Sequence, residues 1–80
     1  MAMHEIRSPL PGTFYRKPAP DQPPFKAEGD PVARGEVIGL IEVMKSFHEI
    51  ASDVDGTVTA FNADNEDAVM AGQVLVQVEI

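Results

Sequence analysis

Alternating apolar and polar residues predict short β-strands along much of the chain. From Val74 to Ile80, valine or isoleucine occupies every second position, with a leucine and two polar residues between them. This alternation is typical of a half-buried strand. A second β-rich run, residues 37–43, is apolar on both faces apart from one glycine and one glutamate. That pattern predicts a strand covered on both sides or lying at a sheet junction, and residues 56–61 form a third run.

Prolines and glycines separate these runs. The seven prolines and six glycines are spread so that no helical pattern of useful length survives between them. Turn-forming residues fill the segments 33–35, 53–56 and 63–67. The sequence therefore predicts a compact all-β sandwich or barrel.

The chain also repeats itself, with two different offsets. A shift of 44 residues places residues 4–15 on 48–59, with identical residues at six of the twelve positions. A shift of 37 residues places 32–43 on 69–80, with matching valines, glycines and glutamates. We therefore expect a single domain, 1–80, built from two copies of one β-unit, about 4–43 and about 46–80.

The change of offset reveals an insertion in the first copy. The difference between 44 and 37 leaves seven extra residues between Tyr15 and Val32. Residues 17–24 lie in this gap and contain four prolines. Proline cannot supply ladder donors, so we expect a stiff protruding loop of about 17–24 and no extra strand.

The two copies meet at residues 44–47, where so short a junction needs a tight connection. A hairpin with Lys45 at its tip is the simplest solution. Local turn chemistry alone predicts a continuous strand, because residues 42–49 contain no Gly, Pro, Asn or Asp. A hairpin built from such residues is less stable than one with turn-forming residues. Such local strain is more often found at sites where a side chain must be displayed.

Composition narrows the function classes. A chain of 80 residues without cysteine buries only about 60% of its unfolded surface, so we expect no deep enzyme cleft. Thirteen acidic and six basic residues give a net charge of -7, which argues against a nucleic-acid or anionic-membrane partner. We expect a cytoplasmic module that works with larger partners.

Residues 42–45, Glu-Val-Met-Lys, resemble the Glu-Ala-Met-Lys attachment motif of biotinyl domains. Residues 8–16, Ser-Pro-Leu-Pro-Gly-Thr-Phe-Tyr-Arg, are similar to the start of the biotin carboxyl carrier domain of bacterial acetyl-CoA carboxylase. The resemblance implies a flattened β-barrel, a barrel-sandwich hybrid of two four-stranded antiparallel sheets with quasi-twofold symmetry. It places the modified lysine at one end and both termini at the other. Two departures stand beside it: Val43 replaces the usual alanine, and Ser46 follows the lysine where an apolar residue is common.

The same resemblance implies a non-catalytic carrier. Biotin, joined to Lys45 by a biotin protein ligase, would accept a carboxyl group at a biotin carboxylase that uses ATP and bicarbonate. A carboxyltransferase would then pass that group to acetyl-CoA, for fatty acid synthesis. The inserted loop would be a thumb that can touch the biotin, formed by Lys17, Pro18, Ala19, Pro20, Asp21, Gln22, Pro23 and Pro24.

Each of the other residues singled out has a functional and a structural interpretation. Glu42 and Glu49 are candidates for ligase recognition or polar positions of the hairpin, and Met44 is a candidate for ligase recognition or a core cap. His4 and His48 are equivalent in the repeat, so we interpret them as matching strand positions and expect no metal site.

Two rival functions stay open. A lipoyl domain shares the symmetric fold, but its typical Asp-Lys-Ala motif differs from Met44-Lys45-Ser46. A β-barrel interaction module without a prosthetic group would leave Lys45 as an ordinary solvated lysine.

Overall fold

The computed structural model describes residues 2–80, and within that range it contains eight strands and no helix. The strands are β1 (Met3–Arg7), β2 (Gly12–Tyr15), β3 (Pro31–Val32), β4 (Val37–Val43), β5 (Ser46–Ala51), β6 (Gly56–Phe61), β7 (Asp67–Val69) and β8 (Val74–Glu79). They form two four-stranded antiparallel sheets, ordered β1-β8-β6-β3 and β5-β4-β2-β7. The predicted all-β class and sheet arrangement are confirmed. No segment of residues 2–80 is a helix that could cross a membrane.

The two sequence copies exchange strands. Each sheet takes two strands from each copy, so neither copy forms a sheet alone. His4 pairs with Val78 in the first sheet, and His48 pairs with Ile41 in the second. These partners are related by the offsets of 44 and 37 residues, so the sheets are related by a quasi-twofold axis. The prediction that the two histidines occupy matching strand positions is correct.

The core lies between the two sheets. One pair of positions shows how its packing differs between the copies: Phe14 and Gly39 in the first, Val58 and Val76 in the second. A Cβ atom added at Gly39 would lie 2.5 Å from Cε1 of Phe14. The glycine therefore makes room for the aromatic ring. The buried hydrophobic residues are Ile6, Phe14, Val32, Ile38, Ile41, Ile50, Val58, Ala63, Val69, Leu75, Val76 and Val78.

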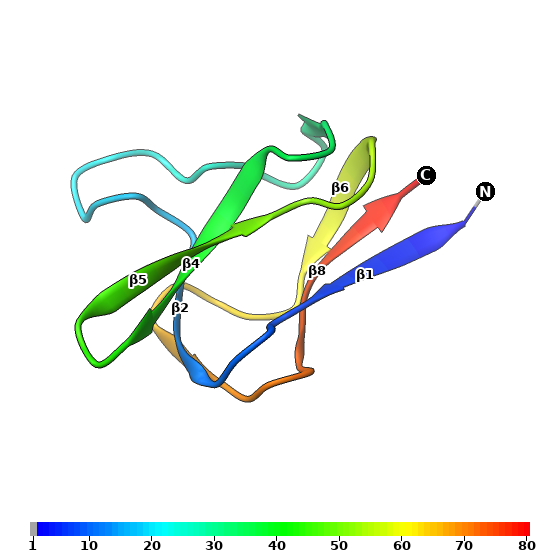
Figure 1. The fold of residues 1–80 in the computed structure, drawn as a ribbon. Helices are drawn as coiled ribbons and strands as arrows, with labels where there is room; N and C mark the ends of the chain where they lie inside the picture. Colours follow the sequence, from blue (N-terminus) through cyan, green and yellow to red (C-terminus); the bar gives the residue numbers. More distant parts are fainter. Residues whose placement is uncertain (1) are drawn as a thin grey trace.

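The two ends of the molecule differ in what they present. At one end the start of β1 and the end of β8 lie side by side (Figure 1). There the Ala2 amide donates to the Ile80 carbonyl at 3.3 Å, and the Ile80 amide donates to the Ala2 carbonyl at 2.9 Å. The turn between β4 and β5 lies at the opposite end (Figure 1). The flattened body measures 38 × 27 × 19 Å.

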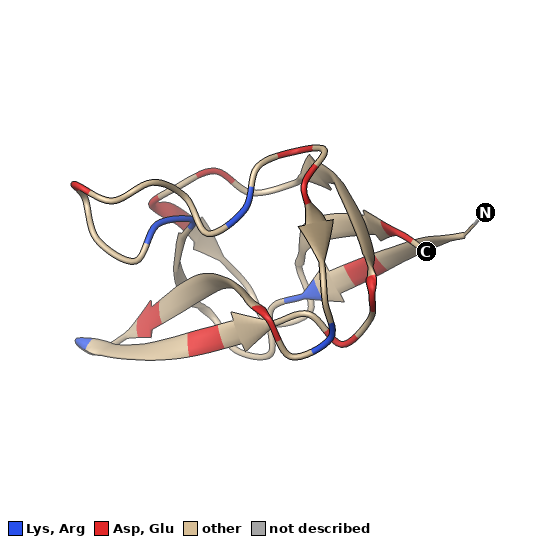
Figure 2. Cartoon of the chain, turned by 90° about the horizontal axis from the view of Figure 1, so that it is seen from above, with Lys and Arg blue, Asp and Glu red and all other residues tan. Residues whose placement is uncertain are grey.

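The proline-rich insertion forms a loop between β2 and β3, at the same end of the molecule as the β4–β5 turn (Figures 1 and 2). The amide of Phe25 donates to the carbonyl of Arg16 at 2.9 Å and closes its base. The Arg16 guanidinium lies 3.8 Å from the centre of the Phe61 ring, and the Arg16 amide donates to Oδ1 of Asn65 at 2.8 Å. The base of the loop is thus fixed to the barrel.

Candidate functional site

A two-residue turn joins β4 to β5. Val43 pairs with Ser46, which leaves Met44 and Lys45 as the turn, with φ angles of 51° and 68°. Two central residues with positive φ form the type I′ turn that usually contains Asn-Gly. Other residues pay about 1–2 kcal/mol each to adopt this conformation. The hairpin predicted at the repeat junction is present, and its tip is strained.

The tip presents its side chains to solvent. Lys45 is exposed, and Met44 is 94% exposed. Figure 2 shows a basic segment at the tip, with acidic segments on both strands behind it. Glu49 is exposed on β5, so it is open to a partner. An enzyme's active site can therefore reach the Lys45 amine together with Met44.

Glu42, the third ligase-recognition candidate, has an internal partner. Its Oε1 accepts a hydrogen bond of 2.8 Å from the hydroxyl of Tyr15. This bond raises the pKa of Tyr15, and partial burial and the negative charges of Glu42 and Glu66 raise it further. The phenol therefore stays protonated and able to donate at neutral pH.

A cleft of about 430 Å³ separates the insertion loop from the outer face of the second sheet. Its floor is formed by Tyr15, Leu40 and Phe47, from β2, β4 and β5. The Tyr15 and Phe47 ring centres lie 5.8 Å apart, with a tilt of 54°. The remaining lining residues are Lys17, Pro18, Ala19, Pro20, Glu42, Asn65 and Glu66. Of the eight predicted thumb residues, the first four line the cleft, whereas Asp21, Gln22, Pro23 and Pro24 do not.

Sequence reasoning missed this floor, although the repeat carried a signal. Thr59, Gln77 and Met3 occupy the positions equivalent to Tyr15, Leu40 and Phe47. The matching face of the first sheet therefore has no aromatic residue at these places. Because the same fold forms with and without the rings, the aromatic floor is a feature of the lysine-bearing end.

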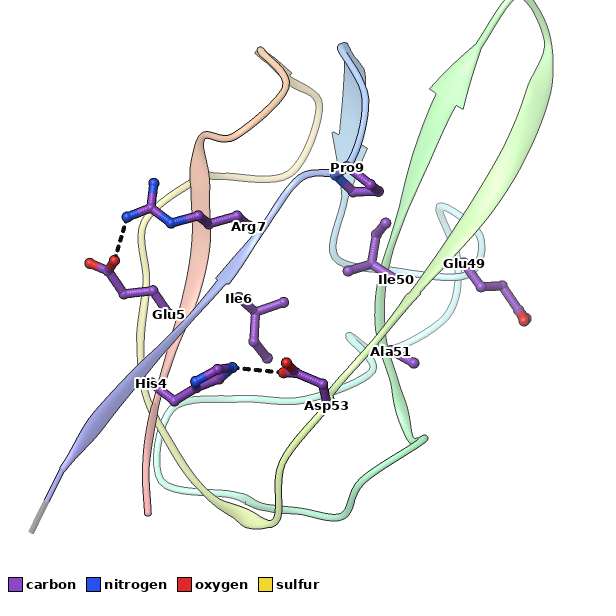
Figure 3. Close-up of a pocket in the computed structure, with 9 residues that line it drawn as sticks. All are labelled: His4, Glu5, Ile6, Arg7, Pro9, Glu49, Ile50, Ala51 and Asp53. Carbon is purple, nitrogen blue, oxygen red and sulfur yellow. Dashed lines mark hydrogen bonds and ion pairs between the residues drawn. The ribbon is translucent and has the colours of Figure 1, made fainter.

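A second cleft, of about 370 Å³, lies between β1 and β5 (Figure 3). Nε2 of His4 and Oδ1 of Asp53 lie 2.7 Å apart across it, which joins β1 to the loop between β5 and β6. The hydrogen bond with His4 is the main cause of the lowered pKa of Asp53. Residues 2–80 contain no group of three or more His, Asp or Glu side chains placed to hold a metal ion.

The exchanged strands, the quasi-twofold axis and the single hairpin opposite the termini define the biotinyl/lipoyl class of β-barrel. Comparison with protein families agrees with this class. The model of the Biotin_lipoyl family, described as "Biotin-requiring enzyme", matches residues 4–78, and the chain belongs to this family. The resemblance to biotinyl domains is confirmed.

Individual relatives carry more specific names. This chain is 40% identical to the biotin carboxyl carrier protein of acetyl-CoA carboxylase from Streptococcus pyogenes over 74 residues. The match covers 92% of this chain and 45% of that protein. Over 60 residues, 75% of this chain, it is 48% identical to the chloroplastic biotin carboxyl carrier protein of acetyl-CoA carboxylase 1 from Arabidopsis thaliana, covering 21% of it. The chain thus spans less than half the length of these curated relatives.

A solved structure shares the fold. The Kluyveromyces lactis urea carboxylase matches with a TM-score of 0.79 and 25% identity. The match covers 99% of this chain and 6% of the carboxylase chain. A domain of this shape is therefore a small part of that larger protein.

Proposed function

We propose that this domain is the biotin carboxyl carrier of an acetyl-CoA carboxylase, with biotin attached through an amide to Nζ of Lys45. The observation that carries the proposal is an exposed lysine on the strained β4–β5 turn of a chain in the biotin-requiring family. The names of the relatives support acetyl-CoA as the carboxyl acceptor. The cytoplasmic location stays a prediction.

Attachment requires a biotin protein ligase and an activated biotin, the biotinyl-adenylate. The Lys45 nitrogen attacks the acyl carbon, the amide bond forms, AMP leaves, and the amine loses a proton to solvent. The amide carries no charge, so the net charge changes from -7 to about -8. Exposure of Met44 beside the lysine, and of Glu49 three residue pairs behind the turn on β5, supports their role as ligase contacts.

The residues around the tip fit biotin. Tyr15, Leu40 and Phe47 offer an apolar floor for a compact ring system, and Glu42 and Asn65 offer polar atoms for a ureido edge. When bound, biotin supplies a ureido nitrogen that carries a carboxyl group between a biotin carboxylase and a carboxyltransferase. The domain itself holds the arm on a rigid barrel, which raises its local concentration at both active sites.

Intact-protein mass spectrometry tests the attachment. The 80-residue chain, coexpressed with an active biotin protein ligase, should gain the mass of one biotinyl group. Lys45→Arg should gain none, and Lys26→Arg, which changes a lysine paired with Glu36 away from the tip, should gain the same mass as wild type. A wild-type chain without added mass contradicts the proposal, and a lipoyl mass would place the domain among lipoyl carriers instead.

The acceptor needs a separate assay. The biotinylated domain, supplied with a biotin carboxylase, ATP, bicarbonate and an acetyl-CoA carboxyltransferase, should support malonyl-CoA formation. Failure with acetyl-CoA, together with success with a urea-carboxylating transferase, would keep the carrier role and overturn the acceptor.

A further inference from the structure

Tyr15 touches both strands of the lysine-bearing hairpin. Its hydroxyl donates to Glu42 Oε1 on β4 at 2.8 Å, and its ring packs against Phe47 on β5. Glu42 and Phe47 are directly opposite each other, one pair away from Val43 and Ser46 at the turn. One side chain from the neighbouring strand β2 therefore braces the hairpin just behind its tip.

We infer that Tyr15 is a positioning residue for Lys45, an inference that rests on the proposed function. By holding Glu42 and Phe47 together, Tyr15 fixes the direction in which the turn leaves the barrel. Glu42 then contributes to recognition from inside the domain, through the Tyr15 hydroxyl, and not as a direct contact with the ligase.

The second sequence copy is an internal control. In the repeat alignment Thr59 corresponds to Tyr15 and Glu79 to Glu42. Thr59 lies at a β-bulge of β6, where Ala60 pairs with Gln77, whereas Tyr15 pairs directly with Leu40. The Thr59 hydroxyl donates to the Gln77 carbonyl at 3.1 Å, within the sheet. The barrel therefore folds with a threonine at this place, and the tyrosine belongs to the copy whose last strand leads into the turn.

The strain of the turn explains why contacts of Tyr15 with both hairpin strands would matter. Both turn residues have positive φ without being glycine, so the turn conformation needs support from its flanking strands. If only a fraction of molecules presents the lysine correctly, the apparent affinity for a partner falls by that fraction. Loss of one hydrogen bond typically changes the equilibrium constant for correct presentation about fivefold, so the correctly presenting fraction falls by at most that factor.

Three matched variants of the 80-residue chain test the inference. Tyr15→Phe removes the donor and keeps the ring. Glu42→Gln removes the charge and keeps an oxygen that accepts from Tyr15. Thr59→Val makes the equivalent hydroxyl loss in the other sheet. Steady-state kinetics with a biotin protein ligase, biotin and ATP give KM and kcat, and amide hydrogen exchange over residues 43–48 reports the hairpin directly.

We expect Tyr15→Phe to speed hydrogen exchange in the hairpin about fivefold and to raise the KM for the domain by up to the same factor, with kcat unchanged. Thr59→Val should stay within about twofold of wild type in both measurements, and Glu42→Gln, which keeps the acceptor for Tyr15, should leave hydrogen exchange in the hairpin close to that of wild type. Unchanged KM and exchange in Tyr15→Phe would overturn the inference. So would a raised KM in Glu42→Gln alone, because that result assigns Glu42 a charged contact with the ligase. If wild type receives no biotin, the proposed function fails, and hydrogen exchange alone decides whether Tyr15 braces the hairpin.

Discussion

Phe14 and Gly39 form a large-and-small pair where the second copy has two residues of equal size. Phe14 is fully buried, and its ring occupies the space that any side chain at Gly39 would need. Val58 and Val76, at the equivalent positions, are also fully buried. Both pairs fill the same layer of the core, so the identity of one residue decides what its neighbour can be.

This complementarity predicts strong coupling between two substitutions. Gly39→Val should destabilise by about 3 kcal/mol because its side chain meets the Phe14 ring, and Phe14→Val should cost about 2 kcal/mol through a cavity. The double variant recreates the valine pair of the second copy. Its loss, measured by urea unfolding, should be smaller than the sum by at least about 1 kcal/mol. Additive losses would show that the two sites do not share this space.

The His4–Asp53 bond predicts a pH dependence of stability. The lowered pKa of Asp53 means that its carboxylate stabilises the fold above the usual aspartate value of about 3.9, and that this contribution disappears as the pH falls through the lower folded value. In thermal melts, Asp53→Asn should lower Tm at neutral pH, and the difference from wild type should shrink as the pH falls below the usual aspartate value of about 3.9 and through the lower folded pKa.

Glu28→Gln removes the same charge from the loop before β3 and serves as the control. A Glu28→Gln variant with the same pH-dependent loss would trace the effect to net charge. A constant difference between Asp53→Asn and wild type across the pH range would contradict a role for Asp53 ionisation.

At the scale of elements, the repeat located what local chemistry missed. Residues 42–49 contain no turn former, and only the alignment of Val43 with Ile80 showed that a strand must end there. The register, with Val43 opposite Ser46, agrees with that reasoning. The cleft floor was not predictable in the same way, because Tyr15 and Phe47 meet only after β2 and β5 have paired on either side of β4.

The insertion loop is predicted to be dispensable for folding. In the second copy, the segment between β6 and β7 corresponds to the segment between β2 and β3 and lacks these residues. Both segments end in the same turn: Asp30 Oδ2 accepts from the Ala27 amide, and Asp67 Oδ2 accepts from the Asp64 amide, each at 2.9 Å. Replacing residues 17–24 with two glycines should therefore leave the barrel folded in an amide NMR spectrum.

The same deletion should change carrier kinetics. If biotin on Lys45 docks in the cleft, as the proposed function implies, the deletion removes one wall of that cleft and with it the docked state. The KM of biotin carboxylase for the domain should then fall. Unfolding on deletion would show that the loop is structural. A KM equal to that of wild type would show that the loop does not contact biotin in a way that affects carboxylation.

At the scale of the whole molecule, the quasi-twofold axis relates the lysine-bearing turn to the paired termini. Val43 and Ser46 flank the turn at one end, and Ile80 and Ala2 are bonded to each other at the other. Lys45 therefore lies in the turn that connects the first sequence copy to the second. At the opposite end, the equivalent residues Ile80 and Ala2 lie next to each other, but no turn connects them.

The symmetry between the two ends allows a direct test of which features a biotin protein ligase recognises. Joining Ile80 to Ala2 through Met-Lys, with new termini between Asp21 and Gln22, gives a circular permutant with two tips. The new tip reads Glu-Ile-Met-Lys-Ala-Met, closely parallel to Glu-Val-Met-Lys-Ser-Phe around Lys45. The permutant should fold, because the joined ends are already hydrogen-bonded and the cut lies outside every strand.

We expect biotin at both tips, with the new one modified about fivefold more slowly because Thr59 takes the place of Tyr15 behind it. Intact mass against time, followed by peptide mapping, distinguishes the two sites. A Thr59→Tyr change in the permutant places a phenol on β6, the strand that pairs with β8 and Glu79, and should narrow the difference. Equal initial rates at the two tips would show that the hairpin sequence alone is the substrate. Complete absence of biotin from the new tip would show that the ligase also needs the loop and the aromatic floor that only the Lys45 end possesses.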